Sequence, residues 1–332
     1  MEILVAAFAV LALGSAIGED SKAPVESFAK AERTGDEIVL IGGLAINAEG
    51  NQYFPVQWQS YTPSNGTSAL REERLISPRY NHAAGLLSDD VVAVVGGVGN
   101  SGVSYATEFF PEGAAIRGPA LSDARLTPSY AMADGRFYVC GGFGFFGQLK
   151  NCESLETRDD GLWTTLADEM PRGSGGSSAV SIGPFYYTLG GYGRVKGLNQ
   201  FSNLLLRYDT QNGGRWRKRA LMAEARAYAS SAVVTVAGSE SIVICGGYDG
   251  AYKSTCERYD VASNQWDAFP EMTQARAYFG MVEMGGSLYA LGGRNERGFM
   301  STVEKWDPRV GRWLVQRGRL LARIAYFAAL VL

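Results

Sequence analysis

The stretch from Ile242 to Trp266, IVICGGYDGAYKSTCERYDVASNQW, decides the fold. It contains a short apolar strand, a glycine pair, a polar loop and a second strand, and a tryptophan then opens a third strand. The glycine pair fits a sharp turn out of the apolar strand, because such a turn needs positive φ and no Cβ. No part of this stretch has helical periodicity. We therefore expect a unit built from β-strands alone.

The same pattern recurs along the whole chain. Six glycine pairs follow apolar runs, and their first members are Gly42, Gly96, Gly141, Gly190, Gly246 and Gly292. Successive pairs are 54, 45, 49, 56 and 46 residues apart. A glycine pair after a strand, repeated about every 50 residues, is typical of propeller blades. Six pairs predict six blades.

Three phrases carry a family resemblance: GGYDG (246–250), CERYDVASNQW (256–266) and TVEKWDPRVGRW (302–313). They resemble the kelch-repeat family, most closely the propellers of kelch-like adaptor proteins. The resemblance covers about residues 37 to 332 and implies an all-β fold, a six-bladed kelch β-propeller. Propellers host many unrelated activities, so the resemblance specifies the fold more sharply than the function.

The chain divides into a signal peptide (1–16), a polar leader (17–36) and the propeller (37–332). Blade 1 lacks a first strand of its own, whereas the last residues repeat the pattern of an arginine followed by an apolar strand, with Arg323 in the arginine position. We expect the C-terminal strand to pair with Ile38–Ile41 and close the first blade, because closure removes exposed sheet edges. The alternative is a membrane tail, but Ile324–Leu332 is too short to span a bilayer.

Residues 1–16 have an apolar run and a small-residue cleavage site at Gly14, Ser15 and Ala16, as in a secretory signal. The run departs from that pattern in carrying Glu2 and no Lys or Arg before it. The alternatives are a buried N-terminal strand or an incorrectly assigned start. We favour secretion.

The four cysteines occupy equivalent places on the second and third strands of two blades, which predicts the pairs Cys140–Cys152 and Cys245–Cys256. Facing residues of neighbouring strands lie within disulfide range. Free buried thiols are the alternative, since a cysteine before the glycine pair also occurs in intracellular kelch-like proteins. Asn65 lies in the chain's N-x-Ser/Thr sequon, in a turn at the outer edge of blade 1, and is a predicted glycosylation site.

Composition and motifs argue against several kinds of chemistry. A net charge of −3 with acids and bases interspersed favours neither nucleic acid nor a membrane as partner. The G-x-G-x-x-G phrases at 97–102 and 142–147 lead into strands rather than helices, so we interpret them as turns and not nucleotide sites. The single histidine, His82, cannot supply an imidazole-based metal site and has no accompanying nucleophile motif. We expect no metal, no cofactor and no catalytic residue.

Arginines near the start of each first strand are the main binding candidates. In the resembling adaptors, arginines at this position ring the channel mouth and bind acidic peptides, and the residue after the glycine pair is often tyrosine. The resemblance therefore implies a ligand face made of Arg79, Arg125, Arg172, Arg226, Arg276, Arg323, Tyr192 and Tyr248. The alternative is that each arginine pairs with neighbouring acids or carbonyls. The repeated glutamates, Glu108, Glu153, Glu257 and Glu304, we expect to build the blades.

The sequence thus predicts a secreted kelch-repeat module that binds a protein or an acidic peptide and performs no catalysis. One alternative is an intracellular substrate adaptor of a cullin-type ubiquitin ligase, although 36 residues before the propeller cannot hold the BTB and BACK regions of such adaptors. The other is a sugar-acting propeller enzyme resembling sialic-acid mutarotases. The sequence specifies no oligomeric state.

Overall fold

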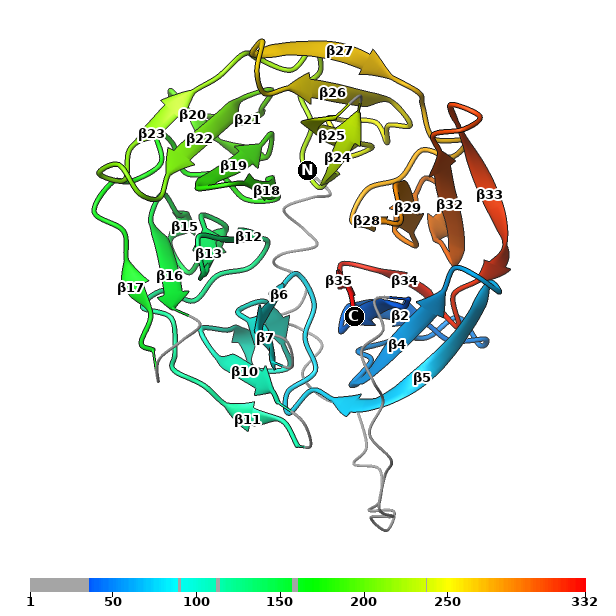
Figure 1. The fold of residues 1–332 in the computed structure, drawn as a ribbon. Coiled ribbons are helices and arrows are strands. Elements are labelled where there is room, and N and C mark those ends of the chain that lie inside the picture. The colour runs from blue at the N-terminus through cyan, green and yellow to red at the C-terminus, as the bar shows by residue number, and fades with distance from the viewer. Residues whose placement is uncertain (1–35, 89–90, 112–113, 157–160, 237) are drawn as a thin grey trace.

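The computed structural model describes residues 36–88, 91–111, 114–156, 161–236 and 238–332. These residues form six antiparallel four-stranded sheets arranged around a central axis (Figure 1), which confirms the six-bladed propeller. No helix among them is long and apolar enough to cross a membrane. The predicted signal peptide, and the leader up to residue 35, lie outside the described residues.

Each blade runs from an innermost strand at the axis to an outermost strand at the rim, and we number the blades by their glycine pairs. Blade 1 consists of β35 (Ala328–Val331), β1 (Ile38–Ile41), β4 (Gln57–Thr62) and β5 (Thr67–Arg74). Blade 2 consists of β6 (Ala83–Ser88), β7 (Val91–Val95), β10 (Thr107–Phe110) and β11 (Ile116–Arg117). Blade 3 consists of β12 (Ser129–Ala133), β13 (Arg136–Cys140), β16 (Cys152–Glu156) and β17 (Thr164–Thr165).

The other three blades repeat this order. Blade 4 consists of β18 (Ser178–Ile182), β19 (Phe185–Leu189), β22 (Leu205–Asp209) and β23 (Trp216–Lys218). Blade 5 consists of β24 (Ser230–Val236), β25 (Ser239–Cys245), β26 (Cys256–Asp260) and β27 (Gln265–Phe269). Blade 6 consists of β28 (Gly280–Met284), β29 (Ser287–Leu291), β32 (Thr302–Asp307) and β33 (Arg312–Arg319).

Small ribbons connect the second and third strands of the blades. Four are two-stranded: β8 (Val98–Gly99) with β9 (Gly102–Val103), β14 (Phe143–Gly144) with β15 (Gly147–Gln148), β20 (Tyr192–Val195) with β21 (Leu198–Phe201), and β30 (Arg294–Asn295) with β31 (Gly298–Phe299). In blade 1, β2 (Leu44–Ile46) lies between β3 (Gln52–Tyr53) and β34 (Arg323–Ala325). Both residues of all six glycine pairs have positive φ, as the turn requires.

The C-terminal strand closes the ring. β35 pairs antiparallel with β1, with Ile38 opposite Val331 and Ile41 opposite Ala328. The Leu332 amide also donates to the Glu37 carbonyl at 3.0 Å. Blade 1 therefore combines the two ends of the described propeller, and the expected closure is confirmed.

The core lies between neighbouring blades rather than within one sheet. Six apolar clusters each join residues of two adjacent blades. One of them contains Val243 of blade 5 together with Met281 and Leu288 of blade 6. Four tryptophan indoles donate to a carbonyl of the preceding blade: Trp163 to Pro119, Trp216 to Asp168, Trp266 to Ala220 and Trp313 to Pro270. These tryptophans therefore each link their blade to the one before it.

Leu70 and Ile116 stand where blades 1 and 2 lack this tryptophan, and the sequence predicts irregular outer strands there. Both side chains are exposed, β5 pairs with β4 through a register shift, and β11 has two residues. β17 is equally short although blade 3 keeps Trp163. Loss of the tryptophan is therefore not the sole cause of a short outer strand.

Candidate functional site

Four of the predicted ligand-face arginines are buried, and each pairs with the glutamate of its own blade. Arg276 Nη2 lies 2.6 Å from Glu304, and the ion pairs Arg226–Glu257, Arg125–Glu153 and Arg79–Glu108 repeat this arrangement. The arginines also donate to backbone carbonyls, including the first glycine of each pair. With all these partners and no exposed surface, they cannot bind a ligand. The prediction that they do is wrong.

The glutamates of these pairs complete the blade. Besides its arginine, Glu108 accepts the backbone amides of Ile76 and Ser77, and Glu257 accepts those of Ala223 and Glu224. Glu153 and Glu304 accept amides at the same place. Each carboxylate thus fixes the segment that enters the first strand. Their predicted blade-building role is confirmed.

Arg172 and Arg323 do not occupy the arginine position. The second glycine of each pair donates its amide to the residue at that position, and in blades 4 and 1 the acceptors are Ser174 and Ile324. Arg172 is half-buried, and burial lowers the pKa of its guanidinium. Arg323 is exposed in β34, at the edge of the blade 1 ribbon. The expectation that both belong to the arginine set is wrong.

The glutamate changes in the same two blades as the arginine. In blade 4, where Ser174 holds the arginine position, Leu206 stands opposite Thr188, at the place where other blades have their glutamate. In blade 1 the equivalent residue is Gln59, whose side-chain oxygen accepts the Leu321 amide. A buried carboxylate without its guanidinium is costly, so the two positions change together.

Six residues with positive φ form a ring at the start of the innermost strands. They are Asn81, Thr127, Gly176, Tyr228, Tyr278 and Tyr326. The amide of each donates to the carbonyl of the corresponding residue in the preceding blade, at 2.7–3.0 Å, and the series returns to its start. Six backbone hydrogen bonds therefore link the blades in a closed circle.

Half of this ring is aromatic. The rings of Tyr228 and Tyr278 are stacked with centroids 4.2 Å apart, and those of Tyr278 and Tyr326 are 4.3 Å apart. On the other side of Tyr228, blade 4 has Gly176, where a Cβ would overlap the tyrosine ring. Burial raises the pKa of all three phenols, which therefore stay protonated as hydrogen-bond donors.

The residues after the glycine pairs extend this aromatic region. Tyr192 and Tyr248 form β-bridges to Gly175 and Ala227, the residues just before the ring positions. Tyr192 contacts Phe201, which contacts Tyr248 at 5.9 Å, and Tyr248 contacts Tyr252. These aromatic residues together form what we call the aromatic face: Tyr192, Phe201, Tyr228, Tyr248, Tyr252, Tyr278, Phe299 and Tyr326. Both predicted ligand-face tyrosines lie on it.

Arg294 is the cation of the aromatic face. It follows the glycine pair of blade 6, donates from Nη1 to the Tyr326 hydroxyl at 3.0 Å, and lies over the Phe299 ring. Its Nε has no hydrogen-bond partner. Tyrosine contacts outweigh burial and raise the pKa of this arginine. Unlike the four arginines paired with glutamates, Arg294 is only half-buried and forms no ion pair among the described residues.

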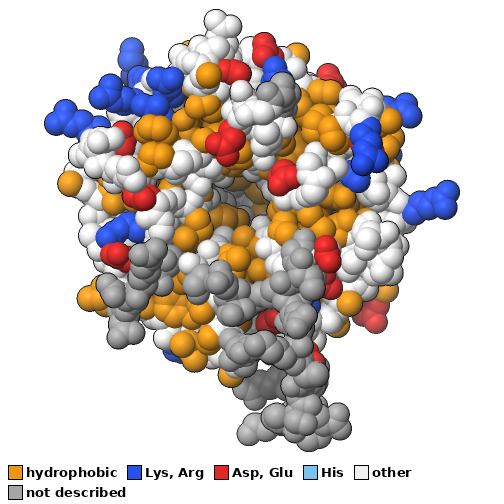
Figure 2. All heavy atoms as spheres, in the orientation of Figure 1, with side chains coloured by type: hydrophobic (Ala, Val, Ile, Leu, Met, Phe, Trp, Pro, Cys, Tyr) orange, Lys and Arg blue, Asp and Glu red, His pale blue; other side chains and the backbone are white. Residues whose placement is uncertain are grey.

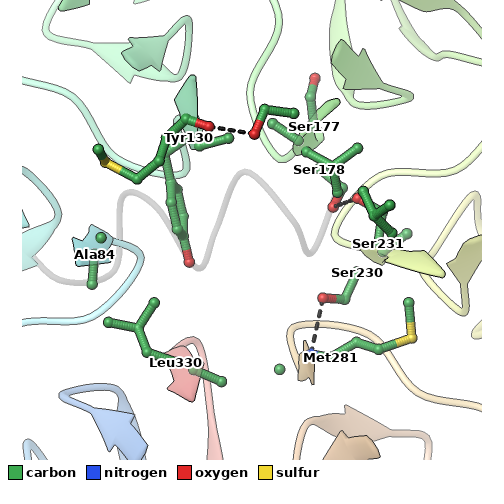
Figure 3. A pocket seen from close by; sticks show the side chains of 18 of the residues that line it. Ala84, Tyr130, Ser177, Ser178, Ser230, Ser231, Met281 and Leu330 are labelled. Atoms are coloured by element: carbon green, nitrogen blue, oxygen red, sulfur yellow. Dashed lines mark hydrogen bonds between the residues drawn. The ribbon is translucent and has the colours of Figure 1, made fainter. Parts of the chain in front are cut away.

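A cavity of about 470 Å³ lies on the axis and is lined by residues of the six innermost strands. Figure 3 shows the Tyr130 hydroxyl pointing into it, with Ser177, Ser178, Ser230 and Ser231 along another wall. Ala84 and Leu330 contribute apolar surface. Burial raises the pKa of Tyr130 to about 12, so this side chain is neutral near pH 7. The lining residues include no acid, no lysine or arginine and no histidine.

His82 is a buried part of blade 2 and not part of a site. Its side chain packs against Gly42 and Gly97, and neither ring nitrogen has a hydrogen-bond partner. Burial, with the nearby charge of Arg79, lowers its pKa to about 3. Among the described residues, no three His, Cys, Asp or Glu side chains gather closely enough to hold a metal ion.

The structure joins both predicted cysteine pairs by disulfides. Cys140 lies opposite Cys152 and Cys245 opposite Cys256 on adjacent strands, with Cα atoms 4.1 Å apart in each pair. Asn65 is exposed in the turn between β4 and β5, the third and fourth strands of blade 1. Its amide oxygen accepts from the Thr67 amide and hydroxyl, which leaves its nitrogen directed away from that turn.

Sequence reasoning missed most of the aromatic face. Tyr228 and Tyr278 stand two residues after an arginine in the repeated phrase RAY, and Tyr326 ends the similar phrase RIAY. This recurrence was the available signal. Phe201 and Phe299 lie on the far strands of ribbons whose lengths differ between blades, so no fixed spacing marks them.

Comparisons with known proteins agree with the repeat. The family model described as "Kelch motif" matches residues 228–273 and 275–316, which belong to blades 5 and 6. Kelch-like protein 40 of Xenopus tropicalis is 31% identical over 201 residues, covering 57% of this chain and 30% of that protein. Kelch-like protein 26 of Mus musculus is 38% identical over 80 residues, which cover 24% of this chain and 13% of that protein. The chain thus spans less than a third of the length of these relatives.

The fold also matches a solved structure. "Structure of YjhT" superimposes with a TM-score of 0.66 at 16% identity, covering 84% of this chain and 97% of that one. Identity this low shows the fold alone. With six glycine-paired blades and kelch-motif matches in two of them, the chain is a six-bladed β-propeller that carries kelch motifs.

Proposed function

We propose that this propeller is an extracellular module that binds an acidic peptide or protein segment on its aromatic face and performs no catalysis. The observation that carries the proposal is the stack of Tyr228, Tyr278 and Tyr326 at positive φ. A bulky side chain rarely adopts this backbone conformation, and such strain concentrates at functional sites. Three strained tyrosines side by side support a binding surface.

The chemistry of the aromatic face suits a carboxylate next to an apolar group. Protonated tyrosines and Arg294 donate hydrogen bonds, and the rings offer rigid contact area at low entropic cost. Tyrosine and arginine are the residues that most often dominate protein interfaces. Lys253, in contrast, is already held by Glu224 and Asp249, so Arg294 is the cation that we expect to meet the partner.

The absence of catalysis is supported by the axial cavity and by His82. Proton transfer near neutral pH needs a group whose pKa lies near that pH. Tyr130 does not meet this condition, because its pKa is about 12. His82 does not meet it either, because its pKa is about 3 and it does not line the cavity. The extracellular location is supported by the two disulfides and the exposed Asn65 turn.

A peptide-display selection on the purified propeller tests the binding function. Selected peptides should be acidic, and their affinity, measured by fluorescence polarisation, should fall at least tenfold in Arg294→Gln and in Tyr252→Ala. The matched control is Arg309→Gln, which removes an exposed arginine from the outer edge of the same blade and should change the affinity less than twofold. Equal losses in all three variants, or selected peptides without acidic residues, would contradict the proposal.

The location is tested separately by intact mass of protein from eukaryotic cells, in medium and lysate. We expect protein in the medium without its first 16 residues, with no alkylatable thiol and with a mass that glycosidase reduces. A cytosolic product with four alkylatable cysteines would favour the intracellular adaptor instead. Turnover of a sugar by the wild-type protein would favour the enzyme.

A further inference from the structure

Blade 4 has a charge unlike that of the whole chain. Between Ser177 and Met222 there are seven lysines and arginines and one acid, Asp209, which gives a net charge of +6 in a chain of net charge −3. The seven cations are Arg194, Lys196, Arg207, Arg215, Arg217, Lys218 and Arg219. Figure 2 shows Lys and Arg side chains gathered at the upper left, over this blade. The even mixing of charges that the sequence suggests does not hold here.

The positive charge of blade 4 is not neutralised by neighbours. The ion pairs found within the described residues include none of the seven cations. Asp209 is occupied in its own turn, where it accepts from the amides of Gln211 and Asn212 and from the Asn212 side chain. An unpaired basic surface creates a field that attracts anions.

Two of these arginines face each other. Arg207 on β22 lies directly opposite Arg217 on β23, so both side chains project from the same face of the sheet. Arg207 lies over the Phe185 ring, with its guanidinium carbon 4.1 Å from the ring centre. Like charges placed opposite each other destabilise a sheet. Such a pair in the outer strands indicates a use other than stability.

The arrangement of the cations suits a linear polyanion. Arg217 lies on the outermost strand, β23, and Arg215 and Arg219 flank this strand directly, at alternate positions that an extended chain spaces by about 7 Å. Arg219 also donates from Nε to the Tyr259 hydroxyl at 3.2 Å. Lys218 is exposed on the other face of the same strand. We call Arg207, Arg215, Arg217, Lys218 and Arg219 the basic edge. A charged chain lying along β23 could contact several of them at once.

The surroundings of the basic edge favour a sulfated polysaccharide over other polyanions. The only aromatic residue on β23, Trp216, packs against Tyr186 and Tyr208 and donates to Asp168, so it offers no platform for stacking a base. No large apolar side chain between Leu205 and Arg219 is exposed for insertion into a membrane. Runs of lysine and arginine of this kind mark nucleic-acid or heparin-binding patches.

We propose that the basic edge binds a sulfated glycosaminoglycan, with arginine guanidiniums and Lys218 contacting the sulfates. The choice of this ligand rests on the extracellular location in the proposed function. The site is separate from the aromatic face, which takes peptide. Binding to purified protein does not depend on secretion, so the two proposals fail independently.

Size-defined heparin oligosaccharides provide the probe, with affinity measured by calorimetry at 0.15 M NaCl and over a salt series. The triple variant Arg215→Gln, Arg217→Gln, Lys218→Gln should bind at least tenfold more weakly, with a smaller salt dependence because fewer counterions are released. The matched control Arg309→Gln, Arg312→Gln, Arg317→Gln removes the same charge from the outer edge of blade 6 and should change the affinity less than twofold. Chemically desulfated heparin should bind poorly to the wild type.

The single variant Arg217→Glu separates function from stability. It replaces the repulsion with Arg207 by an attraction, so the denaturation midpoint should rise while heparin affinity falls. Equal heparin affinity of the two triple variants, or no wild-type binding at 0.15 M NaCl, would overturn the proposal. Displacement of heparin by a lower concentration of a single-stranded oligonucleotide of equal charge would also overturn it and would assign the basic edge to nucleic acid. Binding to anionic vesicles that is stronger than binding to heparin would overturn it as well.

Discussion

Arg276 and Glu304 form an ion pair with no exposed surface, in which Nη2 lies 2.6 Å from Oε1. The same pair occurs in blades 2, 3 and 5, and both members are replaced together in blades 1 and 4. The arginines at the positions that bind ligand in the resembling adaptors therefore stabilise the interior of these four blades. In the proposed function, ligand binding falls instead to the aromatic face and to the half-buried Arg294 beside it.

The blade 4 residues suggest how this pair can be replaced. Arg276→Ser alone or Glu304→Leu alone should each reduce the free energy of unfolding by about 3–5 kcal/mol, because each variant leaves the other charged side chain buried without its partner. The double variant copies Ser174 and Leu206 and should lose much less than the sum. Urea denaturation of the four proteins measures this coupling. Additive losses would show that the two positions are independent.

His82 should make the protein less stable in mild acid. Its pKa is about 3 in the folded protein, below its ordinary value of 6.5, so the unfolded chain binds the proton more readily. The lowered pKa therefore leaves the protein fully stable above pH 6.5. As the pH falls from 6.5 toward 3, the free energy of unfolding drops by about 1.4 kcal/mol per pH unit. The stability difference between wild type and His82→Gln should therefore shrink between pH 7 and pH 4.5. Parallel pH profiles would contradict the assignment.

Gly176→Ala should disturb the tyrosine stack. The glycine has φ +66°, and an added Cβ would overlap the Tyr228 ring. We expect a loss of about 2 kcal/mol or more, from backbone strain and overlap together, with a change in near-UV circular dichroism. Gly183→Ala is the matched control, since it has φ +54° with nothing near its Cβ. The control should lose the strain energy while leaving the near-UV spectrum unchanged.

The two disulfides should contribute separately to stability. Each closes a short loop, with partners 12 and 11 residues apart, and the chain-entropy estimate is about 2–3 kcal/mol for each. Reductant should lower the denaturation midpoint of the wild type in proportion. A variant with all four cysteines replaced by serine should not respond to reductant. Four alkylatable thiols in the native protein would mean that the bonds do not form in solution.

The fold could be predicted from the sequence because its turns impose a local requirement. The glycine pairs must have positive φ in every blade, so their recurrence marks the second strands directly. The pairing of Ile38–Ile41 with the C-terminal strand followed from the same pattern, since blade 1 lacked one strand and the chain ended with one. The glutamates recur at a fixed place on the third strands, which also exposed their role.

The site was harder to predict, for two physical reasons. Distance from the glycine pair located Arg276 correctly but misplaced Arg172 by two residues. The longer first hairpin of blade 5 made a wider spacing acceptable, and blade 4 has Ser174 rather than an arginine at the position itself. The sequence also does not reveal burial: Arg226 and Arg294 are both arginines at repeated positions, yet one is enclosed by partners and the other borders an open surface. Only the packing distinguishes them.

The circle of six amide-to-carbonyl bonds through Tyr326, Asn81 and their counterparts has no first or last member. The hydrogen bond from Leu332 to Glu37 brings the two ends of the described propeller together as well. Which blade comes first along the chain is therefore arbitrary for the finished fold, although their cyclic order is not. A circularly permuted protein, with Leu332 joined through a short linker to Glu37 and new termini at the exposed Gly285–Gly286 turn, would retain every bond of the circle.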